Sequence, residues 1–123
     1  MKVLFCASIL LAVAQESRPV RLPTEPTYLV TCANEPAGFC VRDVNGDGFP
    51  DLAVACNNGG RDAQSFIYLS DRGRFDKPSW TSDDAGVSNG VGLADLDGDG
   101  DEDLVLTRYN HDPAVAYRNT GNG

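Results

Sequence analysis

The chain has 123 residues, and its apolar content of 41% is enough for one small globular domain rather than a disordered acidic tail. Its formal net charge of −8 argues against nucleic acid or an anionic membrane surface as a partner, because both would repel it. An acidic chain suits a cation as ligand, and the 13 glycines and seven prolines predict many turns.

Residues 1–14 are expected to form a signal peptide. Lys2 precedes an apolar run over residues 3–13, which is too short to span a bilayer, and Ala12-Val13-Ala14 is an A-x-A cleavage pattern. We therefore expect no membrane insertion, and a secreted, periplasmic or cell-surface location. Residues 15–24 contain two prolines and are expected to be an irregular lead-in.

Three cysteines would remain after cleavage of this peptide: Cys32, Cys40 and Cys56. In an oxidising compartment they allow one disulfide and one remaining thiol, and the sequence does not choose the pair. A zinc site is a poor interpretation, because no C-x-x-C pair occurs and His111 is the only histidine.

The rest of the chain contains an internal repeat. Two acidic stretches begin at Asp43 and Asp95, which lie 52 residues apart (95 − 43), and the same offset matches Tyr28 with Trp80. Agreement at a fixed offset without gaps indicates a duplicated unit. We therefore divide the chain into a first repeat, residues 25–73, and a second repeat, residues 74–123.

The offset shortens near the end of each repeat, where Tyr68 corresponds to Tyr117 at 49 residues (117 − 68). Short apolar runs between turn residues predict four strands in each repeat. The expected strands are residues 27–31, 39–42, 52–56 and 65–70 in the first repeat and 79–81, 91–94, 104–108 and 114–118 in the second.

Four short strands in a repeat of about 50 residues are typical of a propeller blade. No 3.6-residue apolar period is sustained, so we expect no helix after the signal peptide. The predicted fold is all-β, with two consecutive four-stranded antiparallel blades of a partial β-propeller.

Each repeat contains an acidic loop of the form D-x-[N/D]-G-D-G-x-x-D, followed by a strand-like apolar run. Calcium prefers six to eight oxygen ligands, which positions 1, 3, 5 and 9 would supply from side chains and position 7 from its backbone carbonyl. The predicted ligands of two calcium sites are Asp43, Asn45, Asp47, Phe49 and Asp51 in the first loop and Asp95, Asp97, Asp99, Asp101 and Asp103 in the second.

A solvated acidic hairpin turn is the alternative interpretation of a single Asp-Gly pair, and two nine-residue copies argue against it. Asn45 is a neutral ligand, so the first site is expected to be the weaker one. Glu102 has no place in the ligand pattern and is expected to be solvated. EF-hand and dockerin loops need a carboxylate at position 12 and a following helix, but Val54 and Leu106 occupy that position in β-like runs.

The acidic loops and their flanking strands resemble the FG-GAP/VCBS repeat of integrin α-subunit propellers, calcium-dependent fungal lectins and many secreted bacterial proteins. The resemblance covers roughly residues 25–123, and the stretches that carry it are residues 39–54, 68–75, 91–106 and 117–121. It implies that each loop joins the inner two strands of a blade and that its acidic positions bind calcium.

Such propellers usually have about seven blades, whereas this chain holds two. We therefore expect either a piece of a longer protein or a chain that associates, because open blades expose strand edges. The expected function is a calcium-binding module that acts as a scaffold or as a binding surface for a protein or carbohydrate, and not an enzyme.

Two alternatives stay open: a fragment of a secreted carbohydrate-active enzyme, and a purely structural repeat. The paired acids are better assigned to calcium than to glycoside hydrolysis, and His111 has no Ser or Cys partner in view. Tyr28 and Trp80 could stack on sugars, but equivalent aromatic residues of repeats more often form the core between blades.

Overall fold

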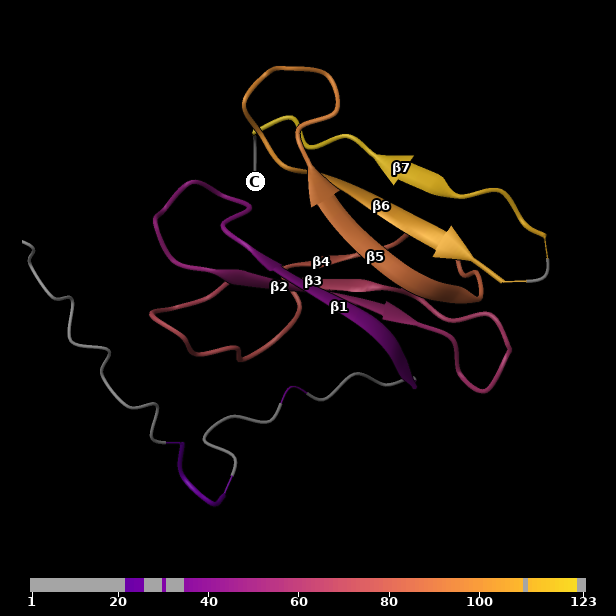
Figure 1. Ribbon diagram of the computed structural model, residues 1–123, viewed down its shortest axis with the longest axis horizontal. Helices are drawn as coiled ribbons and strands as arrows, with labels where there is room; N and C mark the ends of the chain where they lie inside the picture. Colours follow the sequence, from indigo (N-terminus) through magenta and orange to yellow (C-terminus); the bar gives the residue numbers. More distant parts are fainter. Residues whose placement is uncertain (1–21, 26–29, 31–34, 110, 122–123) are drawn as a thin grey trace, which may run out of the picture.

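The computed structural model of the protein describes residues 22–25, 30, 35–109 and 111–121. These residues contain no helix, and seven strands form two antiparallel sheets (Figure 1). The first sheet has the order β1 (Pro36–Arg42), β2 (Asp51–Cys56), β3 (Phe66–Tyr68) and β4 (Trp80–Thr81). The second sheet has the order β5 (Ser88–Ala94), β6 (Asp103–Arg108) and β7 (Val115–Tyr117).

The all-β fold of two blade-like antiparallel sheets is confirmed. No helix that could cross a membrane lies within the described ranges. The predicted signal peptide, residues 1–14, lies outside the described residues.

The two sheets share one design. Pro36 of β1 pairs with Cys56, and Ser88 of β5 pairs with Arg108 at the equivalent position. In both sheets the register shifts directly after this pair, so the same irregularity occurs twice. The 52-residue offset therefore reflects a duplicated strand register as well as a duplicated sequence.

One strand belongs to a different sheet than expected. The predicted first strand of the second repeat, residues 79–81, contains β4, which pairs with β3 of the first sheet through Ile67 and Trp80. The second sheet consequently has three strands in the described part of the chain instead of four, which corrects the expected blade. Apolar periodicity locates a strand but does not identify its neighbour. The equivalent strand of the first repeat, residues 27–31, lies outside the described residues except for Val30.

The core between the sheets forms because successive side chains of a strand point to opposite faces. β5 packs across β1 and β2, so the two sheets lie face to face (Figure 1). Trp80 and Tyr117 meet edge to face at 5.0 Å between ring centroids, which supports the core interpretation of Trp80. The residues packed between the sheets are Cys40, Ala53, Ala55, Ile67, Trp80, Val91, Leu93, Leu104, Leu106, Val115 and Tyr117.

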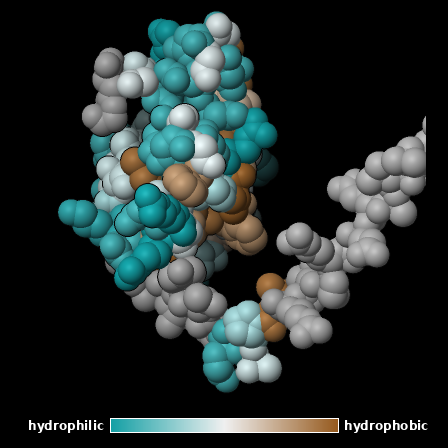
Figure 2. Space-filling model, turned by 90° about the vertical axis from the view of Figure 1, so that its left-hand side faces the viewer, coloured by the Kyte–Doolittle hydropathy of each residue, from teal (hydrophilic) through white to brown (hydrophobic). Residues whose placement is uncertain are grey.

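A second apolar cluster covers the other face of the first sheet. Val54, Phe66 and Tyr68 are buried there beneath the partly buried Val30 and Phe75. The face in Figure 2 is mostly hydrophilic, with apolar residues gathered in a band across its middle.

The cysteines of the first sheet lie on opposite faces. Cys56 belongs to the cluster around Val54, whereas Cys40 packs with Ala53 against the second sheet. These two residues therefore cannot form a disulfide with each other in this fold. Cys32 lies outside the described residues.

Candidate metal centres

The first aspartate of each acidic loop organises the loop backbone. Asp43 accepts hydrogen bonds from the backbone N–H groups of Gly46 at 2.8 Å and Gly48 at 2.8 Å, one on each carboxylate oxygen. Asp95 accepts the equivalent bonds from Gly98 at 2.7 Å and Gly100 at 3.0 Å. These glycines have φ between 73° and 98°, a range that residues with a Cβ rarely adopt, so the motif needs glycine there.

Positions 3 and 5 repeat this arrangement on a smaller scale. In the second loop, Asp97 accepts a bond from the N–H of Asp99, and Asp99 accepts one from the N–H of Asp101. In the first loop, Asn45 and Asp47 accept the equivalent bonds. Each side chain thus holds its own loop with one oxygen, and its second polar atom contacts another side chain.

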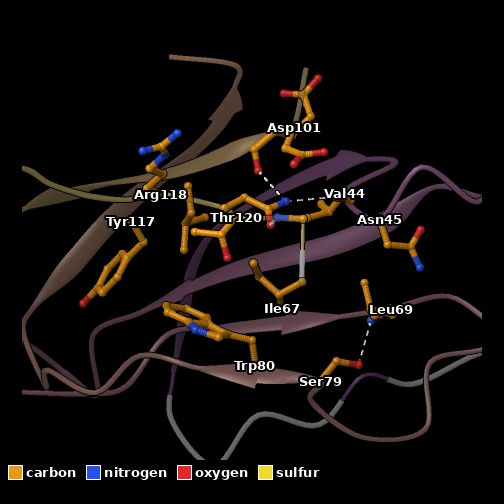
Figure 3. Close-up of a pocket in the computed structure, with 14 residues that line it drawn as sticks. Val44, Asn45, Ile67, Leu69, Ser79, Trp80, Asp101, Tyr117, Arg118 and Thr120 are labelled. Carbon is orange, nitrogen blue, oxygen red and sulfur yellow. Dashed lines mark hydrogen bonds between the residues drawn. The ribbon is translucent and has the colours of Figure 1, made fainter. Parts of the chain in front are cut away.

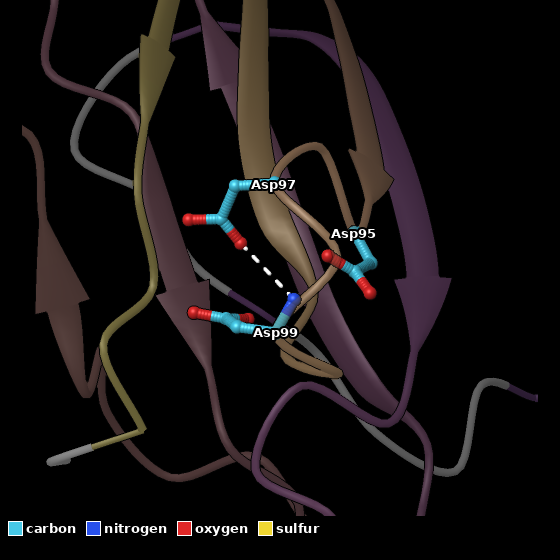
Figure 4. A group of neighbouring side chains, drawn as sticks. All are labelled: Asp95, Asp97 and Asp99. Carbon is cyan, nitrogen blue, oxygen red and sulfur yellow. Dashed lines mark hydrogen bonds between the residues drawn. The ribbon is translucent and has the colours of Figure 1, made fainter.

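The second loop brings three carboxylates to one point. Asp95, Asp97 and Asp99 each offer an oxygen within 4.8 Å of the others, and all three are exposed (Figure 4). In the first loop, Asn45 Nδ2 instead donates a hydrogen bond to Asp47 Oδ2 at 3.0 Å.

Arg118, which follows β7, supplies a positive charge to the second loop. Its Nε lies 2.5 Å from Asp97 Oδ2, and its Nη2 lies 3.2 Å from Asp99 Oδ2. The backbone hydrogen bond from Asp101, followed by the bond from Arg118, lowers the pKa of Asp99 below its usual value. The same pairing with Asp99, supported by the charge of Asp97, raises the pKa of Arg118.

The position-9 aspartates are buried and differ from the other acids of the motif. Asp51 accepts backbone bonds from Val44 at 2.9 Å and Ser70 at 2.8 Å, with one oxygen for each. Asp103 does the same with Leu96 at 3.0 Å and Asn119 at 2.8 Å. Each of these carboxylates joins the start of its loop to the segment after the third strand of its sheet. Their geometry identifies a structural anchor, and their role as calcium ligands stays a prediction.

The two position-7 residues have different surroundings. Phe49 is 41% exposed at the loop tip. The Asp101 carboxylate lies against Gly121, where an added Cβ would come within 2.6 Å of Asp101 Oδ2. Gly121 also has a φ of 66°, which residues with a Cβ rarely adopt, and the carbonyl-ligand role of both position-7 residues remains a prediction.

Glu102 is an inter-sheet residue and not a solvated one, which corrects the expectation from sequence. Its Oε1 accepts bonds from Arg42 Nε at 3.1 Å and Arg42 Nη2 at 2.5 Å. Its Oε2 is buried and has no hydrogen-bond partner within the described part of the structure. Asn119 also bridges the repeats, because its Nδ2 donates to the carbonyls of Val44 at 3.2 Å and Glu102 at 3.3 Å.

A cavity of about 560 Å³ lies between the sheets beside these loops (Figure 3). Ile67, Trp80 and Tyr117 give it an apolar side, and Asp101 and Arg118 give it charged groups. It combines aromatic surface with polar atoms, as ligand sites commonly do.

Two residues of the site could not be predicted from the acidic loops alone. Arg118 and Asn119 lie beyond the acidic motif and reach it because β7 pairs with β6. The 49-residue offset gives a partial signal, because it matches Asn119 with Ser70, whose backbone N–H anchors Asp51 in the same way. The same offset matches Arg118 with Leu69, so a comparison of the repeats does not predict the ion pair of Arg118.

The donor set of both loops fits a hard cation. It consists of carboxylate and amide oxygens on alternate residues of a glycine-containing turn, and nitrogen or sulfur ligands are absent from the two motifs. The second loop contributes three negative charges at one point, and the first contributes two carboxylates and one amide.

A family model described as FG-GAP-like repeat matches residues 43–106, just over half of the chain. The match begins at the first acidic loop and ends within β6. No curated protein and no solved structure matches the chain significantly.

Proposed function

The chain belongs to the FG-GAP-like repeat family, whose repeats typically serve as structural and binding modules, and from this premise we propose that it is a secreted, calcium-stabilised module. Its two acidic loops are the proposed calcium sites, and its sheets are the scaffold that presents a binding surface. The observation that carries the proposal is the convergence of Asp95, Asp97 and Asp99 within 4.8 Å. Three such carboxylates repel one another, and Arg118 offsets only part of their charge, so a divalent cation would stabilise the group.

The first loop supports the same assignment more weakly. The hydrogen bonds from its backbone to Asp43 reproduce those to Asp95 in the second loop, which supports a similar loop shape. Its side chains differ, because Asn45 Nδ2 donates a hydrogen bond to Asp47 Oδ2. Asn45 replaces one carboxylate by a neutral amide, which lowers the electrostatic attraction for a divalent ion.

Calcium binding would stabilise the fold because the unfolded chain cannot hold the ligands together. At about 1 mM calcium and a dissociation constant near 0.1 mM, each site contributes roughly 1.4 kcal/mol. Two sites give about 3 kcal/mol, a large share of the roughly 5–15 kcal/mol typical of a domain.

Thermal unfolding with calcium and with EGTA tests this proposal. We expect EGTA to lower the melting temperature by about 10 °C or more, since a domain of this size loses several degrees for each kcal/mol. Isothermal titration should give two sites, and Asp95→Asn should remove one of them. Asp62→Asn, an exposed acid outside both loops, is the matched control. An unchanged melting temperature and no heat of binding would refute a calcium role.

The inter-sheet cavity is the proposed place for a carbohydrate or peptide ligand. Trp80 and Tyr117 offer aromatic surface, and the buried Glu102 Oε2 offers an unused acceptor for a hydroxyl or amide donor. Binding on a glycan array without turnover of chromogenic glycosides would support a binding module. Turnover would instead support the alternative of a carbohydrate-active enzyme, and the absence of both would favour a purely structural repeat.

A further inference from the structure

The interface between the two sheets joins two different faces. The second sheet contributes its bulky face, which carries Val91, Leu93, Leu104, Leu106, Val115 and Tyr117. The first sheet contributes its opposite, flatter face, which carries Cys40, Ala53, Ala55, Ile67 and Trp80. The contact is therefore head to tail, and each sheet keeps one face that this contact does not use.

The unused face of the first sheet is the repeat equivalent of the bulky face of the second. Phe39 and Val41 correspond to Val91 and Leu93 at the 52-residue offset, and they pair with β2 in the same register. Val91 and Leu93 are partly buried between the sheets. Phe39 and Val41 are 74% and 50% exposed, although both are apolar residues on a regular strand.

The rest of this bulky face is already covered by the chain itself. Val54, Phe66 and Tyr68 are at most 8% exposed beneath Val30 and Phe75. Among the described residues, the open part of this face therefore lies on β1. In the internal interface the equivalent strand, β5, is the one that packs on β1 and β2.

The unused face of the second sheet is the repeat equivalent of the flat face of the first. Gly92 and Val105 occupy the positions of Cys40 and Ala53. Gly92 and Val105 are half-buried, and a Cβ added at Gly92 would meet no atom within 4 Å. The two unused faces of one chain are thus counterparts of the two faces that already pack together inside it.

We propose that copies of this chain associate head to tail, with β1 of one copy packing through Phe39 and Val41 on β5 and β6 of the next copy. The occupant of the exposed bulky face is a second copy, because that copy repeats the geometry of the internal interface and supplies the counterpart surface at Gly92 and Val105. A head-to-tail contact closes a ring when the rotation allows it. Three or four copies would give six or eight sheets, within the range of about four to eight blades found in propellers.

The inference goes beyond the proposed calcium function, since none of its residues belongs to an acidic loop. Sedimentation velocity of the purified protein over a range of concentrations, in saturating calcium, measures the association. We expect an assembly of a few copies. Phe39→Ser with Val41→Ser, a change at exposed positions, should weaken the association by about 100-fold, as the loss of central apolar anchors does. Tyr109→Ser, at another exposed aromatic residue, is the control and should leave it unchanged.

A mixing experiment tests the head-to-tail geometry itself. Gly92→Glu places a charged side chain in the open space over the flat face, so it should also abolish assembly while leaving the bulky face intact. An equimolar mixture of Gly92→Glu with the Phe39→Ser/Val41→Ser variant contains one intact face of each kind. It should therefore form a one-to-one dimer that grows no further.

Three results would overturn the proposal: a wild-type monomer up to the limit of solubility, assembly that both face variants retain, or a mixture that stays monomeric. Calcium titration of the same samples is independent of these outcomes. Assembly without calcium binding would refute only the calcium function, and calcium binding by a permanent monomer would refute only the association.

Discussion

The two acidic loops have the same backbone but different charge partners. Both are held by the aspartate at position 1, which accepts hydrogen bonds from the glycines at positions 4 and 6. In the first loop, Asp47 Oδ2 accepts a hydrogen bond from the neutral amide of Asn45. In the second, Asp97 and Asp99 are satisfied by the guanidinium of Arg118.

This difference shows that both repeats keep the hydrogen bonds that shape the loop, whereas the groups around the two proposed cation sites differ. A ranking of the sites by their ligands alone favours the second loop, because Asp97 replaces Asn45. The structure adds a competitor to that loop, since Arg118 already neutralises part of its charge.

The largest effect is expected where the repeats agree. Asp51→Ala and Asp103→Ala should each lower the free energy of unfolding by about 3 kcal/mol, because each removes a buried carboxylate that accepts two backbone N–H bonds, most of them partly buried. Urea unfolding measures both losses, and Asp62→Ala is the exposed control. Losses that differ by more than about 1 kcal/mol would show that the two anchors are not equivalent.

A covalent difference between the repeats is the next largest expected effect. Arg108 of the second repeat forms an ion pair with Asp84, and the 52-residue offset places Cys56 and Cys32 at the corresponding sequence positions. We expect a disulfide between these two cysteines, worth about 3 kcal/mol for a loop of this length. Peptide mapping under non-reducing conditions identifies the pair, and a Cys32–Cys40 peptide would contradict the correspondence.

If the second loop binds calcium as proposed, Arg118 competes with the ion, and removing Arg118 should produce a smaller change. Arg118→Leu copies Leu69 of the first repeat and removes the positive charge from Asp97 and Asp99. We expect calcium affinity at the second loop to rise about tenfold. Isothermal titration measures it.

Arg42→Leu, which removes a cation paired with Glu102 outside the motif, is the control for this substitution. Asp97→Asn should lower the calcium affinity of the second loop toward that of the first loop. Equal affinities in the Arg118→Leu variant would contradict the ranking by Asn45.

The smallest effect concerns Tyr117, whose hydroxyl donates a hydrogen bond to Asp84. Burial, followed by this bond, raises the pKa of Tyr117 from 10.0 to about 12. The folded state then keeps a proton that the unfolded state releases, so this stability is present below pH 10 and is lost as the pH rises toward 12.

Absorbance titration of the folded protein should show one tyrosine that ionises late, and Tyr117→Phe should remove that step. The variant should also have a flatter loss of stability above pH 10. A late step that persists in Tyr117→Phe would assign it to another tyrosine.

Much of the fold follows from sequence because strand positions depend on local pattern. The expected strands at residues 39–42, 52–56, 91–94 and 104–108 fall within β1, β2, β5 and β6, since turn glycines and aspartates bound them on both sides. The partner of β4 was not predictable in this way, because two residues carry little register information and tertiary packing decides their neighbour.

The candidate site was predictable only as far as the motif extends. The spacing of the motif identifies the loop residues. Arg118, in contrast, lies 21 positions beyond Asp97 (118 − 97) and contacts it because β6 pairs with β7. The sequence predicts a solvated Glu102 because this residue has no place in the ligand pattern, whereas its observed partner, Arg42, belongs to the other repeat. Contacts between repeats depend on how the sheets pack, which a repeat offset does not encode.

The origin of β4 has a consequence for synthesis on the ribosome. The strand that completes the first sheet, Trp80–Thr81, comes from the second repeat. A nascent chain that has released only the first repeat therefore exposes β3 as an unpaired edge, at the stage when incomplete domains are most prone to aggregation. The first sheet gains its fourth strand only after translation has entered the second repeat. The two repeats therefore cannot fold one after the other as independent units.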